Sequence, residues 1–457
     1  MSEQIIQFKQ EAPLERGLGL WQAIALNVSN MVGIGPFITI PLFISAMGGP
    51  QALIGWVIAA LLVICDGLVW SELGAAIPGS GGSYHFLRET FGKYRWGRMI
   101  PFLFVWQFLV SGALEMASGY IGGLQYLEYI APSLATSVSA IPGGVRWIAF
   151  AAAIVVTLIL CQRISFLGKL GVILAAGAML TIMTVIICGL LNFNPKLIAF
   201  PKGAFTLNGK FTVGLGGAML IAIYDYLGYY NVCHLGDEVR NPEKTIPRAI
   251  LISVLLIAFL YLVMNTAIIG VVPWDIAKDS KNIAADFMER LYGRSAGVAI
   301  SLMILWTAIA CMFAITLGYS RIPYAAAKAG DFFSIFAYVH PTRKFPLVSL
   351  LSIGGLTAAF CFFSLQTVID AAVCVRIIIQ FIGQIAALHL LRKQRGPGNL
   401  PFRMWFYPLP SVVALCGWIF VLASGSWIAL GLSVGVVGSG IVVFLIREAV
   451  KKPSFER

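Results

Sequence analysis

Long apolar runs separated by short polar segments make up most of this chain. A helix needs about 20 apolar residues to cross the hydrocarbon core of a bilayer, and runs of that length recur from end to end. By apolar length we place about twelve spans along the sequence. Their approximate ranges are 18–46, 52–77, 99–127, 145–161, 166–191, 212–235, 247–272, 295–320, 346–364, 367–391, 408–424 and 426–446. The pattern predicts an all-α polytopic membrane protein.

Composition supports this interpretation and excludes several classes of protein. Of 457 residues, 59% are hydrophobic and only 11% are charged, whereas a soluble domain carries roughly 25% charged residues. Nucleic-acid binders, cytosolic enzymes and disordered proteins are therefore excluded. The net charge of +12 comes mostly from Lys and Arg in the loops on one side of the spans, the side that also holds both termini. Such residues stay in the cytoplasm, so we expect a multi-pass plasma membrane protein with cytoplasmic termini.

Two spans contain residues that interrupt a helix. The first reads MVGIGPF, with Gly33, Gly35 and Pro36 in the middle of the apolar run. Proline lacks an N–H and clashes with the preceding turn, and glycine allows an open backbone. The sixth span carries Asp225, Gly228 and a following asparagine at mid-depth. Both spans are predicted to be discontinuous helices.

The positions of the two breaks predict an internal repeat. If spans one to five form one unit and spans six to ten another, each break falls in the first helix of its unit, and an odd number of helices inverts the second unit. Interrupted helices at corresponding positions indicate a transport site, although glycine also serves simple helix packing in membranes. We therefore divide the chain into a tail (1–17), a first five-helix repeat (18–191), a second (212–391), two additional helices (408–446) and a second tail (447–457).

A broken helix exposes backbone groups that bind charged ligands. N–H groups freed after 33–36, together with the positive end of the second half-helix, suit a carboxylate. Carbonyls freed in the first half and at 224–227 suit an ammonium group. One pair of breaks would therefore hold an α-amino acid by its two charged ends.

Four ionisable residues lie inside spans, where a charge costs at least ~2.5–3.5 kcal/mol. They are Asp66, Glu115, Asp225 and Arg376. The excess of acids favours a cationic substrate or a carboxylate that exchanges protons, since burial disfavours the charged form. Alternatively, Glu115 or Asp66 forms a structural ion pair with Arg376, and Asp225 caps a half-helix. Glu72 is expected at the interface, as is Asp370.

Other residue types predict little further chemistry. The tyrosines of the sixth span are expected to pack, with Tyr226 and Tyr229 as candidates for a gate over the substrate. The eight cysteines have no metal-ligand spacing and are interpreted as small buried hydrophobes. No nucleophile cluster, metal site or nucleotide motif is found. We therefore expect no enzyme activity, cofactor, metal or nucleic-acid partner.

Three segments resemble the amino acid–polyamine–organocation permeases. They are MVGIGPF, WSELGAAIPGSGGSY after the second span, and DEVRNPEKTIPRAI after the sixth. The resemblance covers about residues 15–405 and implies a 5+5 inverted repeat with two extra helices and alternating access. It also implies which backbone groups bind substrate, and we count Gly228 of the second break among the substrate-binding residues. The donors to the carboxylate would be Gly33, Ile34 and Gly35, and the carbonyls facing the amine would be Tyr224, Asp225 and Leu227.

Two details resemble the polyamine-uptake and L-type branch of that superfamily. Asp66 stands six residues before Glu72, and Ser111, Gly112 and Glu115 match a Ser-Gly-x-x-acid pattern in the third span. One departure is the absence of a lysine in the core of the fifth span, since Lys169 lies near its end. The coupling ion is therefore left open.

These observations predict a secondary active transporter. It would move amino acids or related organic amines by alternating access, coupled to protons or by exchange. Its partners would be a small-molecule substrate, the lipid bilayer and, for coupling, protons. A transporter of polyamines or cationic amines is one alternative. A membrane scaffold or sensor without transport is another, but it leaves the two broken helices unexplained.

Overall fold

The computed structural model describes residues 18–451 except 80, 95, 139–140, 163 and 344. In that part of the chain all regular structure is helical, apart from two isolated bridges. Six helical segments are long and apolar enough to cross a membrane, and a bent helix pair adds a seventh. Shorter apolar helices lie between them. The predicted polytopic all-α class is confirmed, whereas the count of twelve spans stays a prediction. The predicted tail 1–17 lies outside the described residues.

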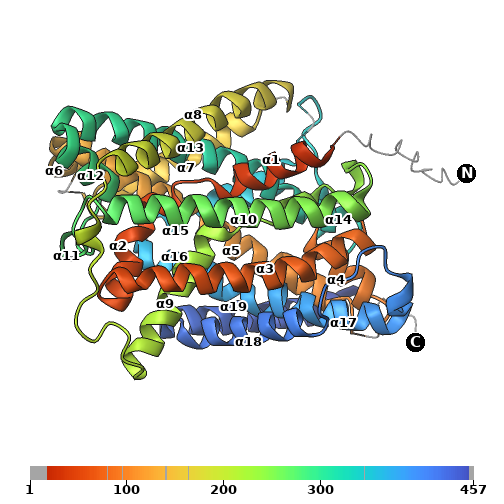
Figure 1. The fold of residues 1–457 in the computed structure, drawn as a ribbon. Coiled ribbons are helices and arrows are strands. Elements are labelled where there is room, and N and C mark those ends of the chain that lie inside the picture. The colour runs from red at the N-terminus through yellow and green to blue at the C-terminus, as the bar shows by residue number, and fades with distance from the viewer. Residues whose placement is uncertain are drawn as a thin grey trace, which may run out of the picture.

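The long helices lie side by side with their axes nearly parallel (Figure 1). In chain order the helices are α1 (Leu20–Met31), α2 (Gly35–Met47), α3 (Leu53–Ala76), α4 (Ser83–Phe91), α5 (Met99–Ile130), α6 (Pro132–Val138), α7 (Arg146–Leu160), α8 (Ile164–Leu191), α9 (Gly209–Tyr226), α10 (Pro242–Ile269), α11 (Trp274–Ala277), α12 (Ile283–Tyr292), α13 (Arg294–Tyr319), α14 (Arg321–Lys328), α15 (Leu347–Phe360), α16 (Leu365–Arg376), α17 (Gly383–Arg395), α18 (Leu409–Ser424) and α19 (Trp427–Lys451).

The first span is broken where the sequence predicts. Helix α1 ends at Met31 and α2 begins at Gly35, and the two helices are bent by 55° relative to each other. Val32 is extended and closes α1 with a hydrogen bond from its N–H to the Val28 carbonyl, at 2.8 Å. Pro36 stands in the first turn of α2, where its missing N–H has no helical partner to lose.

The sixth span is also broken, but its second half differs from the expectation. Helix α9 ends at Tyr226, Leu227 is extended, and Gly228 has φ +107°. The chain then continues in two short 3₁₀ turns, η3 (Asn231–His234) and η4 (Gly236–Glu238). The break is therefore confirmed, while a helix continuing to residue 235 is wrong. A left-handed backbone at this point is tolerated because residue 228 has no side chain.

Several segments expected to be loops are helical. The amphipathic helix α4 lies in the loop 79–98 and packs against α5 and α17. Helices α6, α11 and α12 lie in two other loops. Helix α19 runs on to Lys451, so the predicted tail from 447 begins as helix. Helices α4, α6, α11 and α12 are short, and a search for long apolar runs does not detect them.

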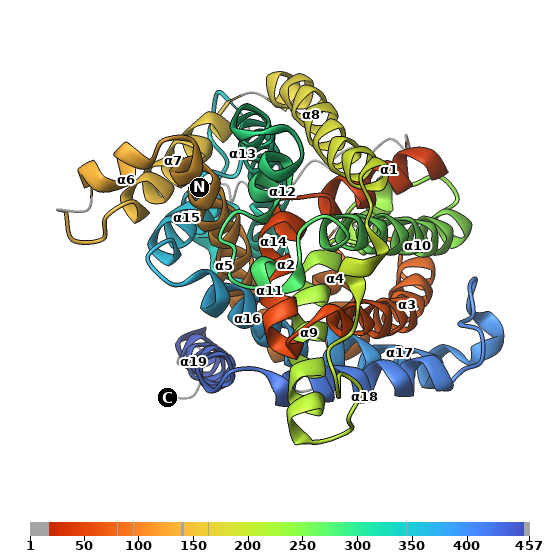
Figure 2. The ribbon, with the colours of Figure 1, turned by 60° about the vertical axis from the view of Figure 1, so that its left-hand side comes forward.

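The broken helices lie among the long helices of the bundle. Helix α2 contacts α9, α1 contacts α10, and α3 packs against both α9 and α10. Figure 2 places α8 on one flank of the bundle and α18 and α19 on the opposite flank. Helix α18 packs on α3 and α19 packs on α5 and α16. The two predicted additional helices thus cover one side of the core that holds the breaks.

Candidate functional site

The two helix breaks are in direct contact. A Cβ atom added to Gly228 would lie 3.2 Å from the backbone carbon of Asn30 and 3.3 Å from the nitrogen of Met31. The N–H of Val232 in η3 donates to Asn27 Oδ1 of α1, at 2.8 Å. The structure thus brings together the two interrupted segments that the sequence singles out. Glycine is required at 228 both by its positive φ and by this close approach.

The Asp225 carboxylate lies against the start of α2. Thr39 Oγ1 donates a hydrogen bond to Asp225 Oδ2, at 2.6 Å. A Cβ on Gly35 would overlap Asp225 Oδ1. That oxygen has no hydrogen-bond partner among the described residues, and the residue is only 4% exposed. The acid therefore contacts the N-terminal turn of the half-helix rather than capping the second half of its own span.

Two side chains from other helices close around the first break. Cys311 Sγ of α13 would lie 2.6 Å from a Cβ on Gly33, and the Ile34 N–H interacts with the same thiol. Tyr261 of α10 donates its hydroxyl to the Met31 carbonyl, at 2.5 Å. Cys311 is not singled out as a site residue by the sequence, because an isolated cysteine in an apolar span gives no signal of its position in space.

The tyrosines of α9 are held by the surrounding helices. The Tyr224 hydroxyl is 2.5 Å from Ser118 Oγ of α5. The Tyr226 hydroxyl reaches the Trp56 carbonyl, at 3.4 Å. Leu227, which follows them, is 3% exposed. In this conformation the candidate gate residue Tyr226 points into α3, and the residues at the break are buried by packed side chains.

Glu115 forms an ion pair with Arg376. The guanidinium NH2 of Arg376 lies 2.5 Å from Glu115 Oε2, and Tyr319 donates to the same oxygen at 2.9 Å. Arg376 also donates to Ser111 Oγ at 3.2 Å and to the Tyr230 hydroxyl at 3.3 Å. The predicted pairing of Glu115 with Arg376 is thereby confirmed. The pair joins α5 to α16 and reaches the segment that follows the second break.

A π-helical turn, η6 (Ile377–Ile382), begins directly after Arg376. Such turns insert a residue into a helix and are frequent at functional sites. Here the turn separates α16 from α17 and follows the residue whose guanidinium is completely buried. This irregularity is not predicted from the sequence, since no glycine or proline marks its start.

Asp66 has a different set of partners from Glu115. Tyr229 donates its hydroxyl to Asp66 Oδ2 at 2.5 Å, and Trp418 Nε1 donates to Oδ1 at 3.0 Å. Asp66 is completely buried. The carboxylate therefore connects α3 to the residue after Gly228 and to α18. Tyr229, the second candidate gate residue, is held by this bond.

Glu72, which is expected at the interface, has its hydrogen-bond partners inside the protein. Its carboxylate is buried and accepts two hydrogen bonds from the Arg392 guanidinium, at 2.6 and 2.7 Å, and one from the Met404 N–H at 2.7 Å. Asp370 is likewise buried, with Gln366 donating to it at 2.7 Å. Both acids lie near span ends, where helix packing rather than depth decides burial.

Comparison with known proteins decides the family. The sequence profile of amino acid permeases matches residues 18–446, a range that includes both breaks. The chain belongs to the amino acid permease family. This permease is 25% identical to the serine/threonine exchanger SteT of Bacillus subtilis over 446 residues, which cover 94% of the permease and 96% of SteT. The permease is therefore a membrane transporter rather than an enzyme.

Two human proteins are similar to the permease. The large neutral amino acids transporter small subunit 2 of Homo sapiens is 24% identical over 441 residues, covering 95% of the permease and 80% of that protein. Cationic amino acid transporter 4 of Homo sapiens is 27% identical over 357 residues, covering 76% of the permease and 55% of that protein. Their names include both neutral and cationic amino acids, so similarity alone does not select between these substrates.

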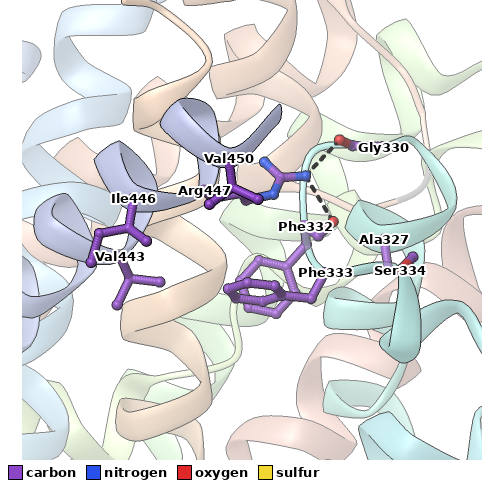
Figure 3. Close-up of a pocket in the computed structure, with 9 residues that line it drawn as sticks. All are labelled: Ala327, Gly330, Phe332, Phe333, Ser334, Val443, Ile446, Arg447 and Val450. Carbon is purple, nitrogen blue, oxygen red and sulfur yellow. Dashed lines mark hydrogen bonds between the residues drawn. The ribbon is translucent and has the colours of Figure 1, made fainter. Parts of the chain in front are cut away.

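A pocket of about 530 Å³ lies apart from the helix breaks (Figure 3). It is lined by the end of α14, the segment after it, and α19, with Phe332, Phe333 and Arg447 among the lining residues. Arg447 donates to the Gly330 and Phe332 carbonyls, both at 2.8 Å. None of the lining residues belongs to α1, α2 or α9. The pocket therefore belongs to the attachment of α19 and not to the candidate site.

Proposed function

We propose that the permease moves amino acids or related organic amines by alternating access, with the substrate bound between the two breaks. The observation that carries this proposal is the contact of the breaks, with Gly228 against Asn30 and Gly35 against Asp225. The N-terminal turn of α2 offers N–H donors and a positive dipole end to an anion. The carboxyl end of α9 offers carbonyls, and Asp225, to an ammonium group.

The burial of this region supports alternating access. Ile34 is 1% exposed and Asp225 is 4% exposed, so a substrate reaches them only when helices move. The breaks are the points at which the half-helices bend without losing their hydrogen bonds. Transport would therefore need two movements. A movement of α1 or of the 3₁₀ turns after Gly228 would open the site to one side of the membrane, and a movement of α2 or α9 would open it to the other side.

The proposal includes two ways to drive transport, which are exchange of one substrate for another and coupling to protons. The name of SteT describes an exchanger, which supports exchange here. Asp66 and Asp225 are the candidate proton carriers, because neither has an ion-pair partner among the described residues. Glu115 is already paired with Arg376. The side chain of Lys169 lies outside the described residues. We also propose the two five-helix repeats and cytoplasmic termini predicted from the sequence.

Uptake of labelled leucine and labelled putrescine into proteoliposomes tests the proposal, with and without an imposed pH gradient. Gly35→Ala is the informative variant, because its methyl group would overlap Asp225 Oδ1. Gly431→Ala is the matched control, since nothing lies within 4 Å of the Cβ that it adds.

We expect Gly35→Ala to lower uptake by about tenfold or more, since misplacing a binding group by an ångström has effects of that size. Gly431→Ala should transport like the unmodified permease. Equal uptake by the two variants would show that the substrate does not bind at the breaks. Failure of the unmodified permease to take up or exchange any member of a panel of amino acids and amines would overturn the transport function itself.

A further inference from the structure

The Asp225 carboxyl lies against the turn of α2 where the carboxylate of an amino acid is proposed to bind. Its Oδ1 is in contact with Gly35 and its Oδ2 accepts from Thr39 Oγ1, so the carboxylate lies on the first turn of α2. This turn, at the positive end of a half-helix of 13 residues, is the part of the site suited to an anion. The anion-binding turn is thus already in contact with a carboxyl group supplied by the protein.

A second carboxylate at this turn would be strongly repelled by an ionised Asp225, and holding both groups there would require one of them to take up a proton. Two carboxylates about 3 Å apart do not both stay ionised, because the interior does not screen their repulsion. No ion pair of the described residues involves Asp225, and the buried cation Arg376 is taken by Glu115. Among the described residues, no cation is left to pair with a second negative charge at this turn.

The free oxygen of Asp225 points to the kind of group that does bind. Oδ1 is an acceptor buried without a partner among the described residues, an arrangement that is unfavourable unless a ligand supplies a donor. An ammonium group would provide both a donor and the opposite charge. A charge-assisted hydrogen bond of this type is about twice as strong as a neutral one.

We propose that Asp225 replaces the substrate carboxylate, so that the permease prefers organic amines without an α-carboxylate over the corresponding amino acids. The proposal rests on the function proposed above and specifies its substrate class. The ammonium group lies between Asp225 Oδ1 and the carbonyls at the end of α9. The remainder of the amine lies along the buried walls of the break, which include Tyr224 and Cys311.

The test uses pairs of compounds that differ only in the carboxylate. Isoamylamine is compared with leucine, and putrescine with ornithine, by uptake into proteoliposomes and by thermal stabilisation of the purified permease. We expect each amine to bind about tenfold more tightly than its amino acid, because the amino acid brings a like charge to Asp225. In Asp225→Asn this preference should be lost or reversed. Asp370→Asn, which changes another buried acid, should keep it.

The outcomes separate this proposal from the transport function. If the unmodified permease binds and transports leucine or ornithine better than the matching amine, the transport function stands and the role of Asp225 as a carboxylate substitute is wrong. If neither compound of either pair binds or is transported, both proposals fail. Thermal stabilisation of the unmodified permease decides the question even if Asp225→Asn does not fold.

Discussion

A completely buried guanidinium is stable at Arg376 because polar atoms surround it. Glu115 supplies the opposite charge, and Ser111 and Tyr230 accept further hydrogen bonds. An ion pair of this kind contributes little compared with apolar side chains of the same size, yet removal of one partner leaves a buried charge. The pair is therefore a feature that specifies how α5 and α16 pack.

Arg376→Met should lower the free energy of unfolding by about 3–5 kcal/mol, because Glu115 is then buried without its counter-charge. The double variant Arg376→Met, Glu115→Leu should recover most of this loss. Thermal unfolding of the purified variants in detergent measures both effects, with the exposed Lys393→Ala as control. A double variant as unstable as the single one would mean that Glu115 is not the group left unpaired.

Some residues of the candidate site can be predicted from the sequence, and others cannot. Asp225 is detectable because an acid inside an apolar span is unusual, and Gly35 because glycine beside proline interrupts a helix. Thr39 and Cys311 give no such signal, since hydroxyl and thiol groups are common in apolar helices. Their contacts with Asp225 and Gly33 depend on how distant spans pack, and that packing is not contained in any local pattern.

At the scale of elements, the break that follows α9 needs a left-handed backbone and also touches the other broken helix. Gly228 has φ +107° and faces Asn30 of α1. Gly293, before α13, has φ +84° with nothing within 4 Å of an added Cβ. A side chain would therefore introduce backbone strain at either position. Only at Gly228 would that side chain also collide with the other broken helix.

Gly228→Ala should abolish transport, whereas Gly293→Ala should lower stability by about 1–2 kcal/mol and leave the transport rate of the folded protein unchanged. The reason is that only the first substitution separates the two breaks. Initial uptake rates, normalised to the amount of folded permease in the vesicles, test this expectation. Transport by Gly228→Ala at the rate of Gly293→Ala would indicate that the contact with α1 is not needed.

The helices differ in how well the sequence predicts them, for physical reasons. Long lipid-facing or core helices such as α5 and α10 appear as apolar runs, because the bilayer requires that composition. Helix α4 has a polar face and lies outside the runs, so hydropathy does not identify it. The second half of the sixth span is apolar enough to be taken as helix, yet it forms 3₁₀ turns, in which Val232 donates to Asn27 of α1, a contact that no local pattern contains.

At the scale of the whole molecule, one set of polar contacts fastens the last helix to the bundle. Arg447 of α19 donates to the backbone of the segment after α14, and Asp331 of that segment pairs with Arg88 of α4 at 2.8 Å. Tyr84 of α4 donates to Asp331 at 2.7 Å. Burial, followed by the hydrogen bond to Asp331, raises the pKa of the Tyr84 phenol, so this donor stays protonated.

Arg447→Ala should lower the free energy of unfolding by about 2 kcal/mol, since several carbonyls lose a charged donor. Arg447→Lys should recover only part of this, because an ammonium group does not reproduce the planar fork of donors. Thermal unfolding and uptake rates check the prediction together. We expect transport per folded molecule to be unchanged, and a loss of transport in Arg447→Ala would mean that the attachment of α19 takes part in the cycle.

The bond between Trp418 and Asp66 also gives the permease an optical reporter of its own. The indole stacks on Phe381 with ring centroids 3.9 Å apart, and its N–H is directed at a carboxylate that also holds Tyr229 beside the second break. Indole emission depends on the charge and polarity next to the ring. A movement of the break, or a proton taken up by Asp66, would therefore change the fluorescence of a residue on α18, outside the two proposed repeats.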